Sequence, residues 1–242
     1  MAYSLIVVIV AFAVFVQTST GFGIALVSMP LLVSLVGLEI AAPLVALVAM
    51  TNRLVMLVYY RESFDRGEVQ PLMLGAIAGI VIGSLLMLFI PFGKHSESVI
   101  ETLLGLLVLA YVGYVLFAPH MPAMGTCYWS YGLGFAGGML ARIFNAGGLP
   151  AVVYADGRGW APATFKGNLQ AYAVISGCLV IAARAINGEF VDVVMQAFLY
   201  SIPGIAFGLA AGFILDRYMD AVRFRKIILI LMVMIALQLI LT

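Results

Sequence analysis

The sequence predicts an all-α polytopic membrane protein, and three observations support this. Of its 242 residues, 64% are hydrophobic and only 10% are charged. The mean hydropathy is +1.16, and long apolar runs are separated by short polar connections. Because an ordinary soluble domain carries about 25% charged residues, this chain could not cover itself with a water-compatible surface. No polar stretch is long enough to fold as a soluble domain.

Apolar runs divide the chain into eight units. The hydrocarbon core of a bilayer is about 30 Å thick, so a spanning helix needs about 20 apolar residues. The first unit opens without a basic stretch and is therefore expected to be retained rather than cleaved as a leader. The expected units are 2–37, 39–60, 68–92, 98–118, 126–157, 164–186, 190–215 and 223–242.

Two of these units, 2–37 and 126–157, are longer than one crossing requires. A continuous helix over 2–37 would be about 50 Å long. Each of these units contains glycines beside hydroxyl or amide side chains, which is where such a helix would break. We expect the breaks within Gln17–Gly23 and within Arg142–Pro150.

Glycine spacing indicates an internal duplication. Gly23 and Gly148 are 125 positions apart, and a triplet of glycines recurs after 129 positions. We therefore expect two repeats, 1–118 and 126–242, in one integrated transmembrane domain. Each repeat would hold four helical units, with its first unit broken or re-entrant at the Gly-rich motif. The triplets, expected to be helix-packing faces, are Gly75, Gly79 and Gly83, then Gly204, Gly208 and Gly212.

The sequence leaves the membrane topology open. If all eight units cross, seven basic residues face one side and three the other. If the first and fifth units instead dip in and return as hairpins, the division is eight against two, which fits the positive-inside rule better. Both arrangements put the two termini outside the cytoplasm.

The placement of charges points to an anion site. All eleven acidic residues fall in loops or near segment ends, whereas Arg53 lies inside the second unit and Arg142 lies beside the second break. An ionised side chain in hydrocarbon costs at least about 2.5–3.5 kcal/mol. With no carboxylate deep in the sequence, we expect a substrate anion to complete these arginines. The alternative is that Arg142 snorkels to an interface or caps helix carbonyls. Arg53 could likewise belong to the interface, since it lies only about 12 Å of helix from Arg61.

The broken units favour an anion site independently. A helix that begins after a glycine break presents unpaired N–H groups and the positive end of its dipole. Neighbouring polar side chains could add donors, although the hydroxyl groups could instead bond their own helix. Lys166 and Asn168 either face the pathway or mark the interfacial start of the sixth unit. The substrate-binding candidates are Arg142, Asn145, Gly147, Gly148, Gln17, Thr18, Ser19, Thr20, Gly21, Gly23, Arg53, Lys166 and Asn168.

At the two breaks the chain resembles the TauE/SafE family of membrane proteins, also called the sulfite exporter or TSUP family. The resemblance covers nearly the whole chain and implies a transporter of sulfite, sulfonates and related small organosulfur anions in the cell inner (cytoplasmic) membrane. Phe22, Ile24 and Ala25 occupy parts of the family's usual GxGGG pattern, so the first half is expected to bind substrate less directly. The matching motifs are Thr20-Gly21-Phe22-Gly23 with Pro30-Leu31-Leu32, Asn145-Ala146-Gly147-Gly148-Leu149-Pro150, Phe165-Lys166-Gly167-Asn168-Leu169, and Pro203-Gly204 with Gly208.

The expected function is a secondary transporter that exposes a midplane anion site alternately to each side. A passive small-anion channel is the alternative.

A net charge of +1 offers no basic surface for nucleic acid. Cys127 and Cys178 fit no metal-ligand spacing, and no nucleophile–base pair suggests an enzyme. We expect no cofactor and no metal. The expected partners are the small anion and the lipid bilayer. A second copy could also bind to form a homodimer, and no residues are assigned to that contact.

Overall fold

The computed structural model describes residues 2–89 and 127–218, together with 102–103, 106–107, 109–110 and 113. The described ranges are helical with short connections and contain no strand. The predicted unit 223–242 lies outside the described residues, as does 98–118 apart from those seven positions. The elements are α1 (Ala2–Thr20), α2 (Ile24–Val36), α3 (Leu38–Tyr59), η1 (Arg61–Ser63), α4 (Arg66–Phe89), α6 (Cys127–Phe144), α7 (Gly148–Arg158), α8 (Pro162–Ile186) and α9 (Asp192–Tyr218).

Five of the described helices, α1, α3, α4, α8 and α9, are long and apolar enough to cross a membrane. The helices α2 and α7 have 13 and 11 residues. At 1.5 Å per residue these two are about 20 and 16 Å long, which is shorter than the hydrocarbon core of a bilayer. The prediction of a multi-pass α-helical membrane protein is therefore confirmed.

The helical path is interrupted in both long units. In the first, α1 ends at Thr20 and α2 begins at Ile24; in the second, α6 ends at Phe144 and α7 begins at Gly148. The backbone takes positive φ values there, 90° and 107° in the first interruption (Gly21 and Gly23) and 56° at Asn145 in the second. Glycine adopts this conformation at little cost and asparagine tolerates it, so the local sequence explains why each helix stops.

The chain forms two compact units, and each combines segments from both halves of the sequence. The first, which we call the α1–α9 unit, contains α1, α2, the first part of α3 up to Val48, and α9. The second, the α4–α6 unit, contains the rest of α3 from Ala49, then η1, α4, α6, α7, α8 and Glu189. The division into repeats 1–118 and 126–242 concerns duplication within the sequence and stays a prediction.

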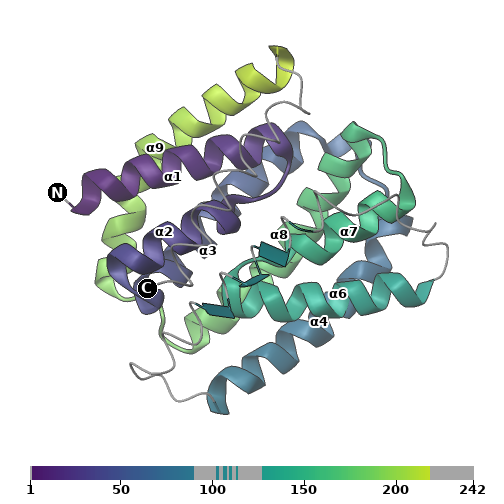
Figure 1. Cartoon of the computed structure of the whole chain (residues 1–242), viewed down its shortest axis with the longest axis horizontal. Helices are drawn as coiled ribbons and strands as arrows, with labels where there is room; N and C mark the ends of the chain where they lie inside the picture. Colours follow the sequence, from purple (N-terminus) through teal and green to yellow (C-terminus); the bar gives the residue numbers. More distant parts are fainter. Residues whose placement is uncertain are drawn as a thin grey trace. The chain divides into compact units, whose positions relative to one another are not determined.

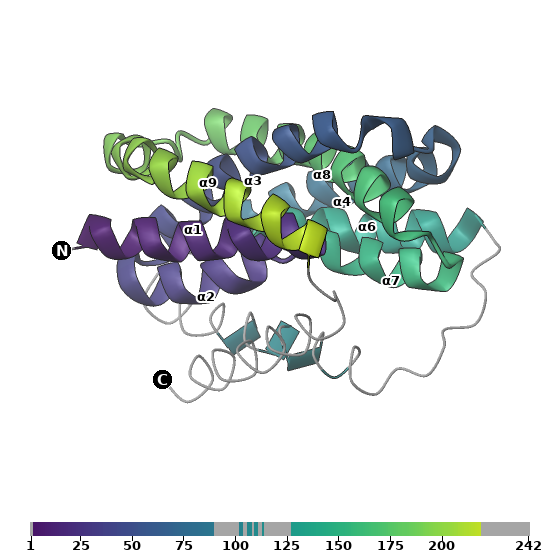
Figure 2. The same cartoon turned by 90° about the horizontal axis from the view of Figure 1, so that it is seen from above.

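In the α1–α9 unit, α1 and α9 lie side by side and run parallel (Figures 1 and 2). A Cβ atom added at Gly208 would lie 2.4 Å from the Ala11 carbonyl oxygen, so the two backbones touch where α9 has no side chain. Such close approach is what small residues provide between membrane helices. The contacts advance in step along both helices, Gly204 on Val7, Gly208 on Ala11, and Gly212 on Phe15 and Thr18.

The α4–α6 unit contains a similar parallel pair. A Cβ atom at Gly79 of α4 would lie 2.0 Å from the Phe135 carbonyl oxygen of α6. The contact is mutual, since a Cβ atom at Gly134 of α6 would lie 2.2 Å from the Leu72 carbonyl oxygen of α4. Both glycine triplets therefore lie on helix-packing faces. The α4 glycines contact Tyr131, Phe135 and Met139 in order.

The helix α7 turns back along α6. A Cβ atom at Gly147 would lie 2.7 Å from the Gly137 carbonyl oxygen, so the break folds onto the preceding helix. Further along α7, the Tyr154 hydroxyl lies beside Ser130 in the first turn of α6. The two helices thus form a hairpin, and α2 runs back beside α1 in the same manner (Figures 1 and 2).

Candidate functional site

Arg142 is buried and paired with a carboxylate. It lies in the last turn of α6 and is 2% exposed. Its Nη2 is 2.8 Å from Glu189 Oε1, and its Nε donates a hydrogen bond to Ser84 Oγ at 3.2 Å. The expectation that Arg142 lacks a permanent carboxylate partner is therefore wrong. Glu189, 47 positions away in sequence, follows α8 in a connection, and the fold brings that connection to the end of α6.

A second arginine, Arg184, shares the same carboxylate. It lies in the last turn of α8 and is 3% exposed. Its Nη1 pairs with the other Glu189 oxygen, and its Nη2 donates to the Arg142 carbonyl oxygen at 3.2 Å. Neither Arg184 nor Glu189 was among the sequence candidates. The signal that could have found them is local, because they stand five positions apart on either side of the turn at Gly188, whose φ is 69°.

Arg53 is in a different electrostatic position. Tyr172 of α8 is the titratable group that acts on its guanidinium, and no described carboxylate does so. Its Nε is covered and has no hydrogen-bond partner. The guanidinium lies against α8 where Gly177 leaves room, since a Cβ atom there would lie 3.3 Å from Arg53 Nη1. The side chain as a whole is half-buried.

Tyr172, which acts electrostatically on Arg53, reaches the break between α6 and α7. Its side chain is buried and its hydroxyl group has no hydrogen-bond partner. A Cβ atom at Gly137 would lie 2.3 Å from this hydroxyl oxygen and 2.9 Å from the Gly147 carbonyl oxygen, so the hydroxyl group lies beside the start of α7. The sequence analysis missed Tyr172 because a tyrosine within an apolar helix carries no distinguishing signal.

The start of α7 offers donors for an anion. No side chain caps this helix at Gly147, and the positive end of the helix dipole lies here. A Cβ atom at Gly148 would meet no atom within 4 Å, so there is open space next to the backbone. We infer a candidate anion site in the α4–α6 unit from Arg53, the Tyr172 hydroxyl group and the α7 N-terminus.

At the break between α1 and α2, the polar side chains already form hydrogen bonds with the local backbone. The Ile24 amide donates to Gln17 Oε1 at 3.2 Å, so one free donor of α2 is already used. The hydroxyl groups of Thr18, Ser19 and Thr20 each donate to the carbonyl oxygen four residues earlier, at 2.8, 2.9 and 2.8 Å. For these hydroxyl groups the alternative of bonding their own helix is the one observed.

Lys166 and Asn168 join the start of α8 to the segment before α4. Lys166 Nζ lies 3.4 Å from the Tyr60 hydroxyl oxygen and 5.4 Å above that ring. Asn168 Oδ1 accepts a hydrogen bond from the Asp65 amide at 2.7 Å. Arg184, beside Arg142, follows Lys166 by 18 positions, or about 27 Å along the helix. Lys166 and Arg142 therefore do not belong to one small-anion site.

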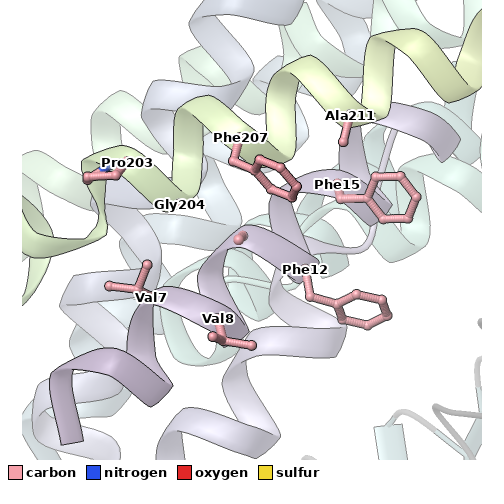
Figure 3. A pocket seen from close by; sticks show the side chains of 9 residues that line it. Val7, Val8, Phe12, Phe15, Pro203, Gly204, Phe207 and Ala211 are labelled. Carbon is pink, nitrogen blue, oxygen red and sulfur yellow. The ribbon is translucent and has the colours of Figure 1, made fainter. Parts of the chain in front are cut away.

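An apolar groove of about 530 Å³ runs along α1 and α9 in their own unit (Figure 3). Phe12, Phe15 and Phe207 line it, and none of its lining side chains is polar. It therefore offers nothing to an anion. Among the described residues, no three His, Cys, Asp or Glu side chains gather as metal ligands would.

The backbone at the second break gives a testable expectation. Asn145 holds φ at 56°, where a Cβ atom costs roughly 1–2 kcal/mol. We expect Asn145→Ala to be less stable than Asn145→Gly by about 1 kcal/mol, measured as thermal unfolding midpoints in detergent. Both variants lose the side chain, so the difference reports the backbone alone. Equal midpoints would show that the positive φ carries no strain.

Comparison with curated proteins and with solved structures gives no match. The model of one protein family, described as Sulfite exporter TauE/SafE, matches residues 6–239. That range includes both helix breaks, both glycine triplets and every residue of the candidate anion site. The match extends over nearly the whole chain, and the protein belongs to the TauE/SafE sulfite exporter family.

Proposed function

We propose that this protein is a secondary transporter that moves a small sulfur oxyanion or organosulfonate across the inner membrane by alternating access. Membership of a sulfite exporter family supports the substrate class, and the membrane-length helices fit transport. The parallel helix pairs in the two compact units support an internal duplication, which is a common plan of secondary transporters.

The observation that carries this proposal is the environment of Arg53. Its Nε lies buried without a hydrogen-bond partner, and the neighbouring Tyr172 hydroxyl group also has none. Leaving buried donors unsatisfied is costly, so a ligand that accepts hydrogen bonds and carries negative charge would be stabilised here. A forked guanidinium, a hydroxyl group and helix N-terminal amides together suit a tetrahedral or pyramidal oxyanion.

In this proposal the two arginines have different roles. Arg53 contacts the transported anion, with Tyr172 and the start of α7 around it. Arg142, which the sequence analysis placed first, is held by Glu189 and Ser84 in this conformation. The α6–α7 hairpin would enter the membrane and return, and such broken helices near the bilayer centre are typical of transporter binding sites.

Uptake into proteoliposomes tests the function directly. We expect sulfite or a simple sulfonate such as methanesulfonate to enter saturably, and unlabelled sulfite to compete. Chloride should compete poorly, because a spherical ion cannot use the forked geometry of a guanidinium. The measurement is initial uptake rate against concentration, with protein-free liposomes as the control.

A passive channel would give a different result. Its flux would rise linearly with the gradient, without saturation at modest concentration and without acceleration by anion on the opposite side. Either linear flux or equal uptake of sulfite and chloride would contradict the proposed transporter.

A further inference from the structure

Two buried arginines share one carboxylate in the α4–α6 unit. Arg142 and Arg184 each pair with a different oxygen of Glu189. Arg142 and Arg184 carry two positive charges against one negative charge, so the group keeps a net charge of +1. Removing charge from water is expensive unless it is compensated, and the single Glu189 carboxylate balances only one of the two positive charges.

The arginines and the carboxylate are held differently. Arg142 and Arg184 lie in the last turns of α6 and α8, and each side chain is 3% exposed. The Glu189 side chain is 25% exposed and comes from the connection after α8, next to Gly188 in the left-handed conformation. The positive groups are therefore fixed in helices, while the negative group reaches them from the surface of the unit.

The pair of guanidinium groups has spare donors. A guanidinium group has five N–H donors. Arg184 Nε is buried and has no hydrogen-bond partner, because Glu189 pairs with Nη1 of the same guanidinium group. The two arginines could hold a ligand with more acceptor oxygens, or with a different oxygen spacing, than Glu189 provides.

We propose that Arg142 and Arg184 form a second anion-binding site, separate from Arg53, which the Glu189 carboxylate occupies in this conformation. When Glu189 withdraws, a small oxyanion takes its place between the two guanidinium groups. The identity of this oxyanion with the transported one rests on the proposed function. The binding of a small oxyanion at this site is independent of it.

A purely structural ion pair would behave differently. In that case Glu189 would only tie the end of α8 to the end of α6, and its removal would destabilise the protein whatever anion is added. An anion site predicts that a small free oxyanion replaces the missing carboxylate and restores stability.

The test is chemical rescue of Glu189→Ala, made in the Arg53→Gln background so that the Arg53 site cannot contribute. Thermal unfolding midpoints are measured in detergent against increasing formate or sulfite at constant ionic strength. We expect the midpoint of Glu189→Ala to fall and then to rise saturably by several degrees, as binding to the folded state requires. The parent Arg53→Gln protein should shift far less, because Glu189 still fills its site.

Glu62→Ala in the same background is the matched control, since Glu62 is an exposed carboxylate in η1. It should neither lose stability nor gain an anion response. If Glu189→Ala does not fold, Glu189→Ser empties the same space between the guanidinium groups and serves in its place. An equal anion response in Glu189→Ala and its parent overturns the second site. So does a response that chloride reproduces at the same concentration.

Discussion

Replacing Arg53 with glutamine is expected to reduce sulfite uptake roughly 10- to 100-fold, because hydrogen bonds to a charged group contribute about 1.5–3 kcal/mol. The variant should be as stable as the wild type without ligand, since it removes a charged group whose Nε is buried and lacks a partner. The measurements are initial uptake rate in proteoliposomes and the unfolding midpoint with and without sulfite. The sulfite-induced rise of the midpoint should disappear together with uptake.

The control for this substitution is Arg61→Gln, which makes the same chemical change at an exposed position in η1. It should leave uptake within about twofold of wild type. Tyr172→Phe removes only the buried hydroxyl group and is expected to reduce uptake by up to roughly tenfold, the value of one neutral hydrogen bond. Unchanged uptake in Arg53→Gln would remove Arg53 from the site.

The second large effect concerns the parallel pair α4 and α6. Gly134→Ala places a Cβ atom 2.2 Å from the Leu72 carbonyl oxygen, a separation that real atoms do not take. The helices must separate, and we expect a loss of about 1–3 kcal/mol, the usual cost of overpacking. The apparent unfolding midpoint in detergent should fall by several degrees.

The same helix provides a control for that loss. Gly132 stands two positions earlier, is exposed, and has no atom within 4 Å of an added Cβ. Gly132→Ala makes the same chemical change and raises helix propensity, so its midpoint should equal or exceed that of the wild type. If the two variants melt at the same temperature, the close contact at Gly134 does not hold α4 and α6 together.

Features that depend on residues close in sequence could be predicted from it. Apolar runs of membrane length gave the helices, because the bilayer imposes that length on any segment that crosses it. The interruptions at Gly21–Gly23 and at Asn145–Gly147 were also readable, since glycine and asparagine permit the left-handed backbone found there. Arg53 was identified as a cation deep in an apolar run, and the described residues give it no carboxylate.

Pairings between distant residues could not be predicted. Glu189 looked like any loop acid, and only the packing of α6 beside α8 brings it to Arg142. The Tyr172 hydroxyl group can lie beside the second break because Gly137, on another helix, has no side chain and leaves room for it. Whether a buried charge has a partner is decided only when the chain folds. The pairing of each arginine therefore depends on tertiary structure.

The parallel contact between α1 and α9 has a consequence for biosynthesis. Helix α1 ends at Thr20 and its partner begins at Asp192, so the ribosome must add most of the chain before the two can meet. At about 5–20 residues per second, α1 waits on the order of 10–30 s for α9. During that time the face of α1 that will pack against the α9 glycines is in contact with lipid or insertion machinery. The α4 and α6 pair is closer in sequence and can assemble earlier. Although α1 is made first, its packing is completed last, when α9 arrives.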